Sequence, residues 1–388
     1  MKYKVNFINN SYRRFARRHI FELLWAFFKC LWNGDLILRQ EVSKFEDNLA
    51  KYTGTRYGIA VGSGTDALIL SMKVLGIGPG DEVIVPSHTF IASIYAVKAV
   101  GATPILIDVK QDELMDVSQL EKLITPKTKA IIPVHFHGKV CEMDIIMSIA
   151  NKYKLFVVED ACQALGSTFN PQITLITLRG KAAGSFGDLG CFSFNTPKLL
   201  GGWGDGGGIV TNNRELAEKL YLLRNHYNMA QTSVRMADFP TPEIVHWAGK
   251  SRLDNIQAAM LNVKWKYYDK LLARRREIAN IYCEGLRNLP IKLPIYGDGD
   301  VVQEFIIRIG NSEERQKFKE FMDKKGIELL IRETTPNHKV KDLGLEHFSL
   351  PVTESISLDA CRLPAYPELY NWEVRKIIKA IKEFYAGC

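Results

Sequence analysis

The sequence predicts an α/β protein with a mostly parallel central sheet flanked by helices, followed by a smaller α+β unit. From residue 57 to about residue 160, short β-branched runs alternate with stretches of helical length, the order of repeated strand, helix and strand units. After about residue 255 the sequence changes to long charged helical segments. A chain of 388 residues is long enough to bury a large core or two packed domains.

The first 34 residues are expected to form a separate N-terminal helical segment. Paired arginines precede a strongly apolar stretch that ends at Trp32, and Glu22 and Lys29 interrupt this stretch, which argues against a signal peptide. One interpretation is a helix packed on the domain or on a dimer partner. The alternative is a basic amphipathic helix that makes a weak contact with an anionic membrane surface.

The large domain is expected over residues 35–255 and the small domain over residues 256–388. Apolar runs bounded by turn residues are typical of buried strands. In chain order these runs are YGIAV, EVIVPS, TPILIDV, KAIIPVHF and LFVVED, and the turn GIGPGDE (76–82) separates two of them. FGDLGCFSF and GGIVTNN come next, and helices are expected within 253–287, 314–325 and 371–385.

Composition excludes several classes of protein. The formal net charge is +8 with 24% charged residues, which suits anionic small molecules as well as nucleic acid; no helix-turn-helix is evident, so we expect no nucleic-acid partner. No apolar run reaches the length of about 18 residues that a membrane span needs. The seven cysteines contain no C-x-x-C pair, which indicates a reduced, cytoplasmic protein without a disulfide framework.

The segment VGSGTDAL follows an expected strand and opens an expected helix. Its backbone amides are suited to bind a phosphate at the helix N-terminus. Gly62, Gly64 and Ala67 also fit the dinucleotide fingerprint G-x-G-x-x-A, which leaves a nicotinamide-dependent enzyme open. That fingerprint needs an acidic residue at the end of the next strand, where this sequence has Ser87 and His88. An ordinary tight turn is the third interpretation.

Lys198 lies in FSFNTPKLLGGWGDGGG (192–208), ahead of a run of glycines. An amine in a dry pocket becomes accessible in its neutral, nucleophilic form, and adjacent glycines let a flat ring approach the backbone. Alone, the segment fits a surface lysine in a flexible loop equally well. Gly202, Gly204 and Gly207 form a second, weaker fingerprint match that runs into a strand instead of a helix.

Glu159 and Asp160 end the apolar strand of VVEDACQALGS, and parallel sheets present ligand-binding groups at this end. One acid there could bind a metal, act as a base, pair with a cation or cap the next helix. A phosphate site, a strand-end acid and Lys198 together are the parts that pyridoxal 5′-phosphate requires: an anion site, a carboxylate for the pyridinium nitrogen and an amine for the aldehyde.

These motifs resemble the DegT/StrS-type (DegT/DnrJ) sugar aminotransferases. The resemblance runs from about Asp35 to the C-terminus through GSGTDAL, GIGPGDEVIVPSHTFIAS, AIIPVHFHG, VVEDACQALGS, GDLGCFSFNTPKLLGGWGDGGGIVTNN and SRLDNIQAA. It implies the pyridoxal-phosphate-dependent transferase fold type I, which is aspartate aminotransferase-like. It also implies that Lys198 forms the internal aldimine with the cofactor and shuttles a proton. Asp160 would pair with the pyridinium nitrogen of the cofactor and Gln163 would bind its phenolic oxygen. Phe90 would stack on its ring.

The resemblance also implies a phosphate site and a dimer. Ser193 would bind the phosphate together with the amides of Gly64, Thr65 and Asp66 in GSGTDAL. Family members are homodimers that share active-site groups, and Lys250 would supply a cation to the phosphate across the interface. The family usually has an aromatic residue followed by an asparagine or lysine at these two positions, where this sequence has Gly249 and Lys250.

The resemblance implies a nucleotide-linked keto sugar as acceptor and L-glutamate as donor, giving an amino sugar for lipopolysaccharide O-antigen or glycan biosynthesis. GTDAL favours the 3-keto over the 4-keto enzymes. Lys198 argues against the related 3-dehydrating branch, which has histidine there. Two departures affect the substrate pocket: GIELLIRETTPNHK keeps only Pro336 and His338 in register, and residues 170–179 look like an insertion.

Three other interpretations stay open at this point. A nicotinamide-dependent sugar oxidoreductase would use Gly62, Gly64 and Ala67, and a non-catalytic regulator would keep the fold without the reaction. His135 and His137 alternate along VHFHG with Cys141 nearby, so a metal site is conceivable. Because isolated strand histidines usually make ordinary hydrogen bonds, we expect no metal there.

Overall fold

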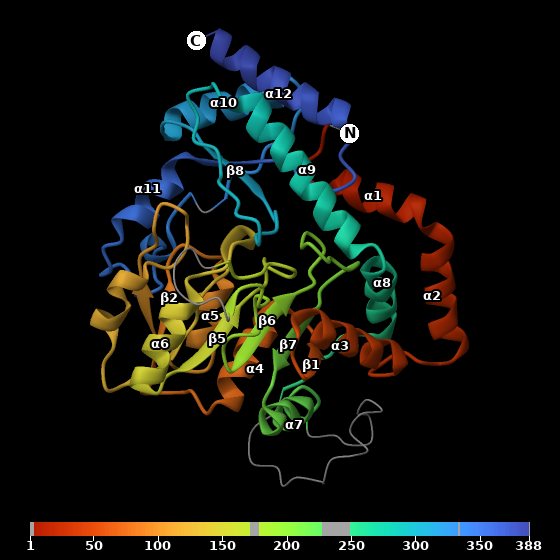
Figure 1. Ribbon diagram of the computed structural model, residues 1–388, viewed down its shortest axis with the longest axis vertical. Helices are drawn as coiled ribbons and strands as arrows, with labels where there is room; N and C mark the ends of the chain where they lie inside the picture. The colour runs from red at the N-terminus through yellow and green to blue at the C-terminus, as the bar shows by residue number, and fades with distance from the viewer. Residues whose placement is uncertain (1–3, 171–177, 227–248, 333, 388) are drawn as a thin grey trace.

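The computed structural model describes residues 4–170, 178–226, 249–332 and 334–387. A central sheet is covered by helices on both faces, and α9, α10 and α12 lie beyond one end of it (Figure 1). The helices are α1 (Asn9–Arg18), α2 (Ile20–Trp32), α3 (Gln40–Thr53), α4 (Gly64–Val74), α5 (Ala92–Ala99), α6 (Met143–Tyr153), α7 (Arg214–Leu223), α8 (Asn255–Trp265), α9 (Tyr268–Leu286), α10 (Ser312–Lys324), α11 (Pro351–Asp359) and α12 (Asn371–Ala386).

The main sheet has seven strands in the order β1-β7-β6-β5-β4-β2-β3. They are β1 (Tyr57–Val61), β2 (Glu82–Pro86), β3 (Thr103–Ile107), β4 (Thr128–Ile131), β5 (Phe156–Asp160), β6 (Leu189–Ser193) and β7 (Gly207–Thr211). The strands from β3 to β6 pair in parallel, and β7 is antiparallel to both of its neighbours, β6 and β1. The expectation of a mostly parallel sheet flanked by helices is therefore confirmed.

The segment expected to be helical over residues 253–287 forms two helices, α8 and α9. The chain turns between them so that the buried Tyr268 donates a hydrogen bond from its hydroxyl to the Leu165 carbonyl, 2.8 Å away. Helix α8 packs against α2 and α3, whereas α9 packs against α12. The break therefore lets one charged segment cover two different cores.

A second hydrophobic core lies among α9, α10, α12 and a two-stranded antiparallel sheet, β8 (Phe305–Arg308) and β9 (Ala360–Leu363). Val5 belongs to this core and forms a parallel bridge with Ile327. The Glu328 amide donates to the Val5 carbonyl at 3.0 Å. The beginning of the described chain is thus packed into the core built by its last third.

The N-terminal segment forms α1 and α2, which run along one side of the molecule (Figure 1). Phe15, Leu23 and Cys30 pack against α8. Phe21 and Trp32 on the other face are 85% and 93% exposed. Among the described residues, no helix combines the length and apolar character needed to cross a membrane.

Candidate active site

A cavity of about 410 Å³ lies at the carboxyl ends of the parallel strands. Lys198 and Asp160 both line it, so the amine and the carboxylate predicted to flank one ring open into the same space. Its lining also includes Gly64, Thr65, Phe90, Gln163 and Ser193 from the motifs, and Gln303, Glu304, Arg332 and Arg362 from the chain beyond residue 300. The chemistry predicted from separate motifs converges here.

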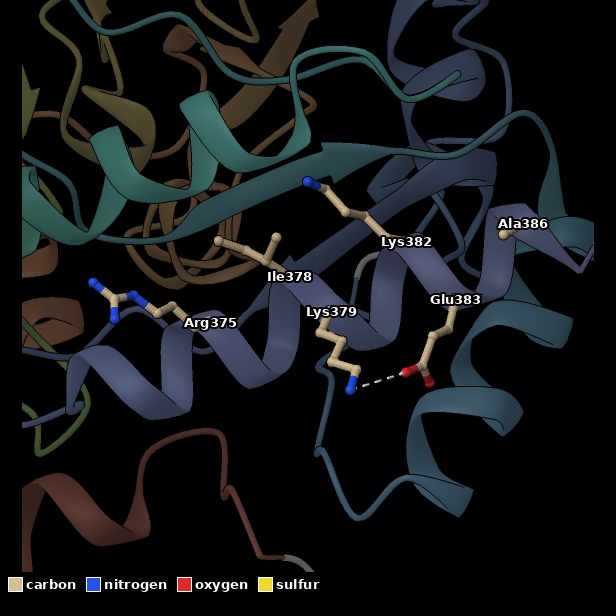
Figure 2. Close-up of a pocket in the computed structure, with 6 residues that line it drawn as sticks. All are labelled: Arg375, Ile378, Lys379, Lys382, Glu383 and Ala386. Atoms are coloured by element: carbon tan, nitrogen blue, oxygen red, sulfur yellow. Dashed lines mark ion pairs between the residues drawn. The ribbon is translucent and has the colours of Figure 1, made fainter.

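A second hollow, of about 370 Å³, lies on the outer surface of α12. Its lining is Arg375, Ile378, Lys379, Lys382, Glu383 and Ala386, with Lys379 and Glu383 paired at 4.0 Å (Figure 2). All of these side chains come from one helix, and none lines the cavity of Lys198. The residues predicted to bind the cofactor and carry out the reaction therefore lie in the first cavity, which Lys198 lines.

The loop that carries Lys198 is held from two directions. Gln303 accepts a hydrogen bond from the Leu199 amide at 3.0 Å and donates to the Pro197 carbonyl at 3.1 Å. At Gly201 a Cβ atom would lie 2.0 Å from the Thr196 carbonyl oxygen. The first glycine of the run is therefore needed to fold the chain back on itself directly after the lysine.

Asp160 ends β5 and is buried. Its Oδ2 accepts a hydrogen bond from the Ser93 hydroxyl at 2.7 Å, and its Oδ1 accepts from the Cys162 amide at 3.2 Å. Burial and the nearby Asp160 carboxylate raise the pKa of the Cys162 thiol well above its usual value. The carboxylate is thus fixed in place by Ser93, the last residue of GIGPGDEVIVPSHTFIAS, to which the sequence analysis assigned no role.

Glu159, the neighbouring acid, points away from the cavity. It accepts hydrogen bonds from the amides of Gly184, Phe186 and Gly187 at 2.6 to 2.7 Å and contacts His135 Nε2 at 2.9 Å. Glu159 therefore fixes the loop before β6. Successive side chains of a strand point to opposite faces of the sheet. Glu159 therefore stabilises the fold, whereas Asp160 faces the cavity.

The expected phosphate site is the N-terminus of α4, where Gly64 and Thr65 line the cavity beside Ser193. A Cβ on Gly64 would lie 2.8 Å from Ser193 Cβ, so glycine is what lets the serine approach the helix end. Asp66 differs from the prediction. Its amide donates to the N-cap Ser63 hydroxyl at 3.0 Å, its carboxylate accepts from Ser251 at 2.7 Å, and it does not line the cavity.

The remaining predicted residues divide into two groups. Phe90 and Gln163 line the cavity; Gln163 Oε1 accepts from the His137 amide at 3.0 Å, which directs its amide NH₂ group to other partners. Lys250 is exposed, forms a bridge with Asn225 and does not line the cavity of this chain. Most of the insertion expected at 170–179 lies outside the described residues.

Pro336 and His338, the two positions kept in register, do not line the cavity. His338 is fully buried, with Nδ1 2.9 Å from the Ser87 hydroxyl and Nε2 2.9 Å from Glu354. From this stretch Arg332 lines the cavity, together with Glu304 and Arg362 from other parts of the chain. The Arg362 Nε atom donates to Glu304 at 2.7 Å. No quoted motif contains Glu304 or Arg362, because these residues are distant from Arg332 in the sequence and reach the same cavity only in the folded chain.

The two histidines of VHFHG do not share a site. The Cys141 amide donates to His135 Nδ1 at 3.2 Å, which fixes the tautomer whose Nε2 hydrogen faces Glu159. His137 follows in a turn with a φ of 57°, where its ring meets Glu113 and Glu304 at 3.0 and 3.3 Å. The strict alternation expected through His137 is therefore wrong, because β4 has already ended at Ile131.

The fold and this cavity together define the class of the protein: a pyridoxal-phosphate-dependent transferase of fold type I. The chain belongs to the DegT/DnrJ/EryC1/StrS aminotransferase family, whose profile matches residues 22–382. The protein is thus an aminotransferase, as the motifs predicted.

Comparison with known proteins gives relatives over almost the whole chain. The dTDP-3-amino-3,6-dideoxy-alpha-D-galactopyranose transaminase of Aneurinibacillus thermoaerophilus is 39% identical, over 96% of this chain and 98% of its own. The dTDP-3-amino-3,4,6-trideoxy-alpha-D-glucose transaminase of Streptomyces venezuelae is 37% identical, over 92% and 91%.

Solved structures agree with this assignment. A DegT DnrJ EryC1 StrS aminotransferase from Brucella abortus superposes with a TM-score of 0.87 at 33% identity, covering 98% of this chain and 99% of its own. The PLP-form of a sugar aminotransferase from Streptococcus pneumoniae, Spr1654, superposes with a TM-score of 0.83 at 27% identity, covering 94% and 96%.

Proposed function

We propose that the protein transfers an amino group to the keto carbon of a nucleotide-linked sugar, a 3-keto sugar in preference to a 4-keto sugar, with L-glutamate as donor. The observation that carries the proposal is the placement of Lys198 and Asp160 in one cavity. The 3-amino-sugar transaminases among the relatives support the acceptor class. The glutamate donor and a role in O-antigen or glycan synthesis are supported by the family resemblance.

The cavity fits pyridoxal phosphate. The N-terminus of α4 with Ser193 offers amide and hydroxyl donors at one end, and the buried Asp160 offers a carboxylate at another. Gln163 and the exposed ring of Phe90 complete the lining. When bound, the cofactor supplies an electron sink for the negative charge that develops on the substrate carbon.

Each residue then has a defined task. Asp160, held by Ser93, would keep a proton on the ring nitrogen of the bound cofactor, because an adjacent carboxylate favours the charged form of a base. Lys198 Nζ would carry a proton between the substrate carbon and the carbon of the cofactor that bears the amino group, which requires the amine to be neutral when it accepts the proton. Arg332 is exposed at the cavity wall and is suited to bind the diphosphate of the sugar nucleotide.

We propose in addition a cytoplasmic homodimer with shared sites. The large apolar side chains of Phe90, which lines the cavity, and of Ile91, Tyr95 and Trp203 are exposed, and a partner subunit would cover them. Lys250 would then reach the phosphate site of the partner. The isolated cysteines support a reducing compartment.

One geometric observation weighs against the oxidoreductase alternative. A dinucleotide fingerprint joins two neighbouring parallel strands through its helix. Here β1, which precedes the glycines, is antiparallel to β7 at one edge of the sheet, and β2, which follows α4, lies near the other edge. Gly62, Gly64 and Ala67 therefore match the dinucleotide fingerprint in sequence but do not lie between two neighbouring parallel strands.

The experiment is a spectrum followed by a substrate screen. We expect the purified protein to show the visible absorption of the bound cofactor, Lys198→Ala to lose that band, and the exposed-lysine control Lys122→Ala to keep it. L-glutamate should convert the band. UDP-, dTDP- and GDP-linked 3- and 4-keto sugars are then tested, with products identified by mass spectrometry and NMR. Tight nicotinamide binding without the band would favour the oxidoreductase, and a band that glutamate never converts would favour the regulator.

A further inference from the structure

We propose that His88, Glu113 and His137 form a binding site for a divalent transition-metal ion, with Zn²⁺ as the best match. The three side chains come from the loops after β2, β3 and β4. These strands are adjacent and parallel, so their carboxyl ends bring the loops together. The site adjoins the cavity of Lys198 and is independent of the function proposed above.

The distances fit a coordination shell. His88 Nε2 lies 3.3 Å and His137 Nε2 lies 3.0 Å from the same oxygen, Glu113 Oε2. All three atoms lie within 4.8 Å of one another. Ligand atoms at about 2.0–2.1 Å from a tetrahedral zinc ion lie roughly 3.4 Å apart, and two histidines with one glutamate are a known zinc ligand set.

The imidazole of His137 is buried without the hydrogen bonds that its position demands. Both ring nitrogens are shielded from solvent and lack a hydrogen bond of normal geometry, although carboxylates lie at ion-pair distance. A buried polar atom left in this state costs roughly 1–3 kcal/mol. A metal ion between His137 Nε2 and Glu113 would satisfy the nitrogen without a proton between them.

The backbone at two of the ligands is held in an unusual conformation. Glu113 has a φ of 71° and His137 a φ of 57°, in the left-handed region that residues other than glycine rarely adopt. Such conformations concentrate at functional sites. Here the two residues belong to different loops, and their side chains meet each other.

A second carboxylate lies behind the cluster. Glu304 Oε2 is 3.3 Å from His137 Nδ1, and Arg362 Nε donates to the same oxygen at 2.7 Å. A carboxylate on the outer nitrogen of a histidine ligand fixes its tautomer and orientation. Since Glu304 and Arg362 also line the cavity, a metal ion would fix three loops and, through His137, one wall of the active site.

The test uses the cofactor-loaded protein, without an affinity tag, after dialysis against a chelator. Zn²⁺ is titrated by calorimetry, and Co²⁺ serves as a spectroscopic probe. We expect one ion per chain and visible cobalt bands at longer wavelength than the cofactor absorption. His88→Gln and Glu113→Gln should lose stoichiometric binding, whereas His347→Gln, which removes an exposed histidine outside the cluster, should keep it. Glu304→Gln should weaken zinc affinity about 10- to 100-fold.

Two results would overturn the proposal. Wild-type protein that binds no ion would identify the cluster as an ion-paired His137 between two glutamates. Undiminished binding by folded His88→Gln and Glu113→Gln would place the ion elsewhere, for example on the cysteines. If circular dichroism shows that both variants are unfolded, anomalous scattering at the zinc edge from wild-type crystals decides between a peak at the three side chains and a peak at any other position.

Discussion

At the scale of single residues, the site shows what a motif can and cannot predict. Lys198, Asp160 and Ser193, which come from separate motifs, line one cavity. Asp66 does not line this cavity, and its amide donates to the N-cap Ser63. Gln303 and Arg362 lie outside every quoted motif, and Ser93 ends one without a predicted role; each is positioned by a contact with a distant part of the chain.

The hydrogen bond between Ser93 and Asp160 leads to the first prediction. Ser93→Ala removes a donor to a buried carboxylate, so we expect the free energy of unfolding to fall by about 1.5 kcal/mol and kcat to fall about tenfold because Asp160 is no longer held in position. The measurement is a steady-state assay with parallel thermal unfolding, and exposed Ser349→Ala is the control. A fall in stability that accounts for the whole loss of activity would contradict a positioning role.

At the scale of elements, strands and helices were largely predictable because burial and period are local properties of the sequence. The antiparallel direction of β7 was not, since GGIVTNN reads the same in either orientation. Nor was the break between α8 and α9, which depends on a hydrogen bond from Tyr268 to Leu165. Local sequence patterns predict which segments form helices and strands. The direction of a strand and the end of a helix depend on contacts with residues that are distant in the sequence.

Lys264 on α8 donates to the Gly201 carbonyl at 3.0 Å and so ties this helix to the glycine run after Lys198. Burial lowers the pKa of Lys264 to about 8. Because this pKa is lower in the folded than in the unfolded chain, the charged lysine destabilises the fold below about pH 8, and that cost disappears as the pH rises toward about 10.5.

We therefore expect the free energy of unfolding of the wild type, relative to Lys264→Met, to rise by at most about 3 kcal/mol over this pH window. Urea unfolding at a series of pH values measures it. Subtracting the variant removes the contribution of every other titrating group. A difference that stays flat, or falls, with increasing pH would show that Lys264 is solvated in the folded protein.

At the scale of the whole molecule, the N-terminal segment contacts the C-terminal helix α12, a contact that the sequence did not predict. Arg14 on α1 pairs with the buried Glu373 of α12 at 2.6 and 2.8 Å, and its guanidinium lies 4.3 Å from the ring centre of Tyr370. Pairings over such sequence separations leave no periodic signal. The division into domains near residue 255 stays a prediction, and the first residues of the chain pack with the last core.

Arg14→Met leaves Glu373 buried without its cation, and we expect a loss of about 3 kcal/mol in the free energy of unfolding. Calorimetry measures the change. The control is Arg17→Met on the same helix, where the side chain is exposed. Equal, small effects of both substitutions would mean that α1 contributes little to holding the two ends of the chain together.

The bridge from Val5 to Ile327 has a consequence for how the protein emerges during translation. At about 5–20 residues per second, roughly 15 to 60 seconds separate the synthesis of these two residues. Throughout that interval Val5 lacks its native partner, and the aromatic side chains of α1 and α2 lack theirs until α8 has been synthesised. We therefore expect the growing chain to bind ribosome-associated chaperones. Ribosome-bound nascent chains halted before residue 327 should be captured by these chaperones more strongly than chains halted near the C-terminus.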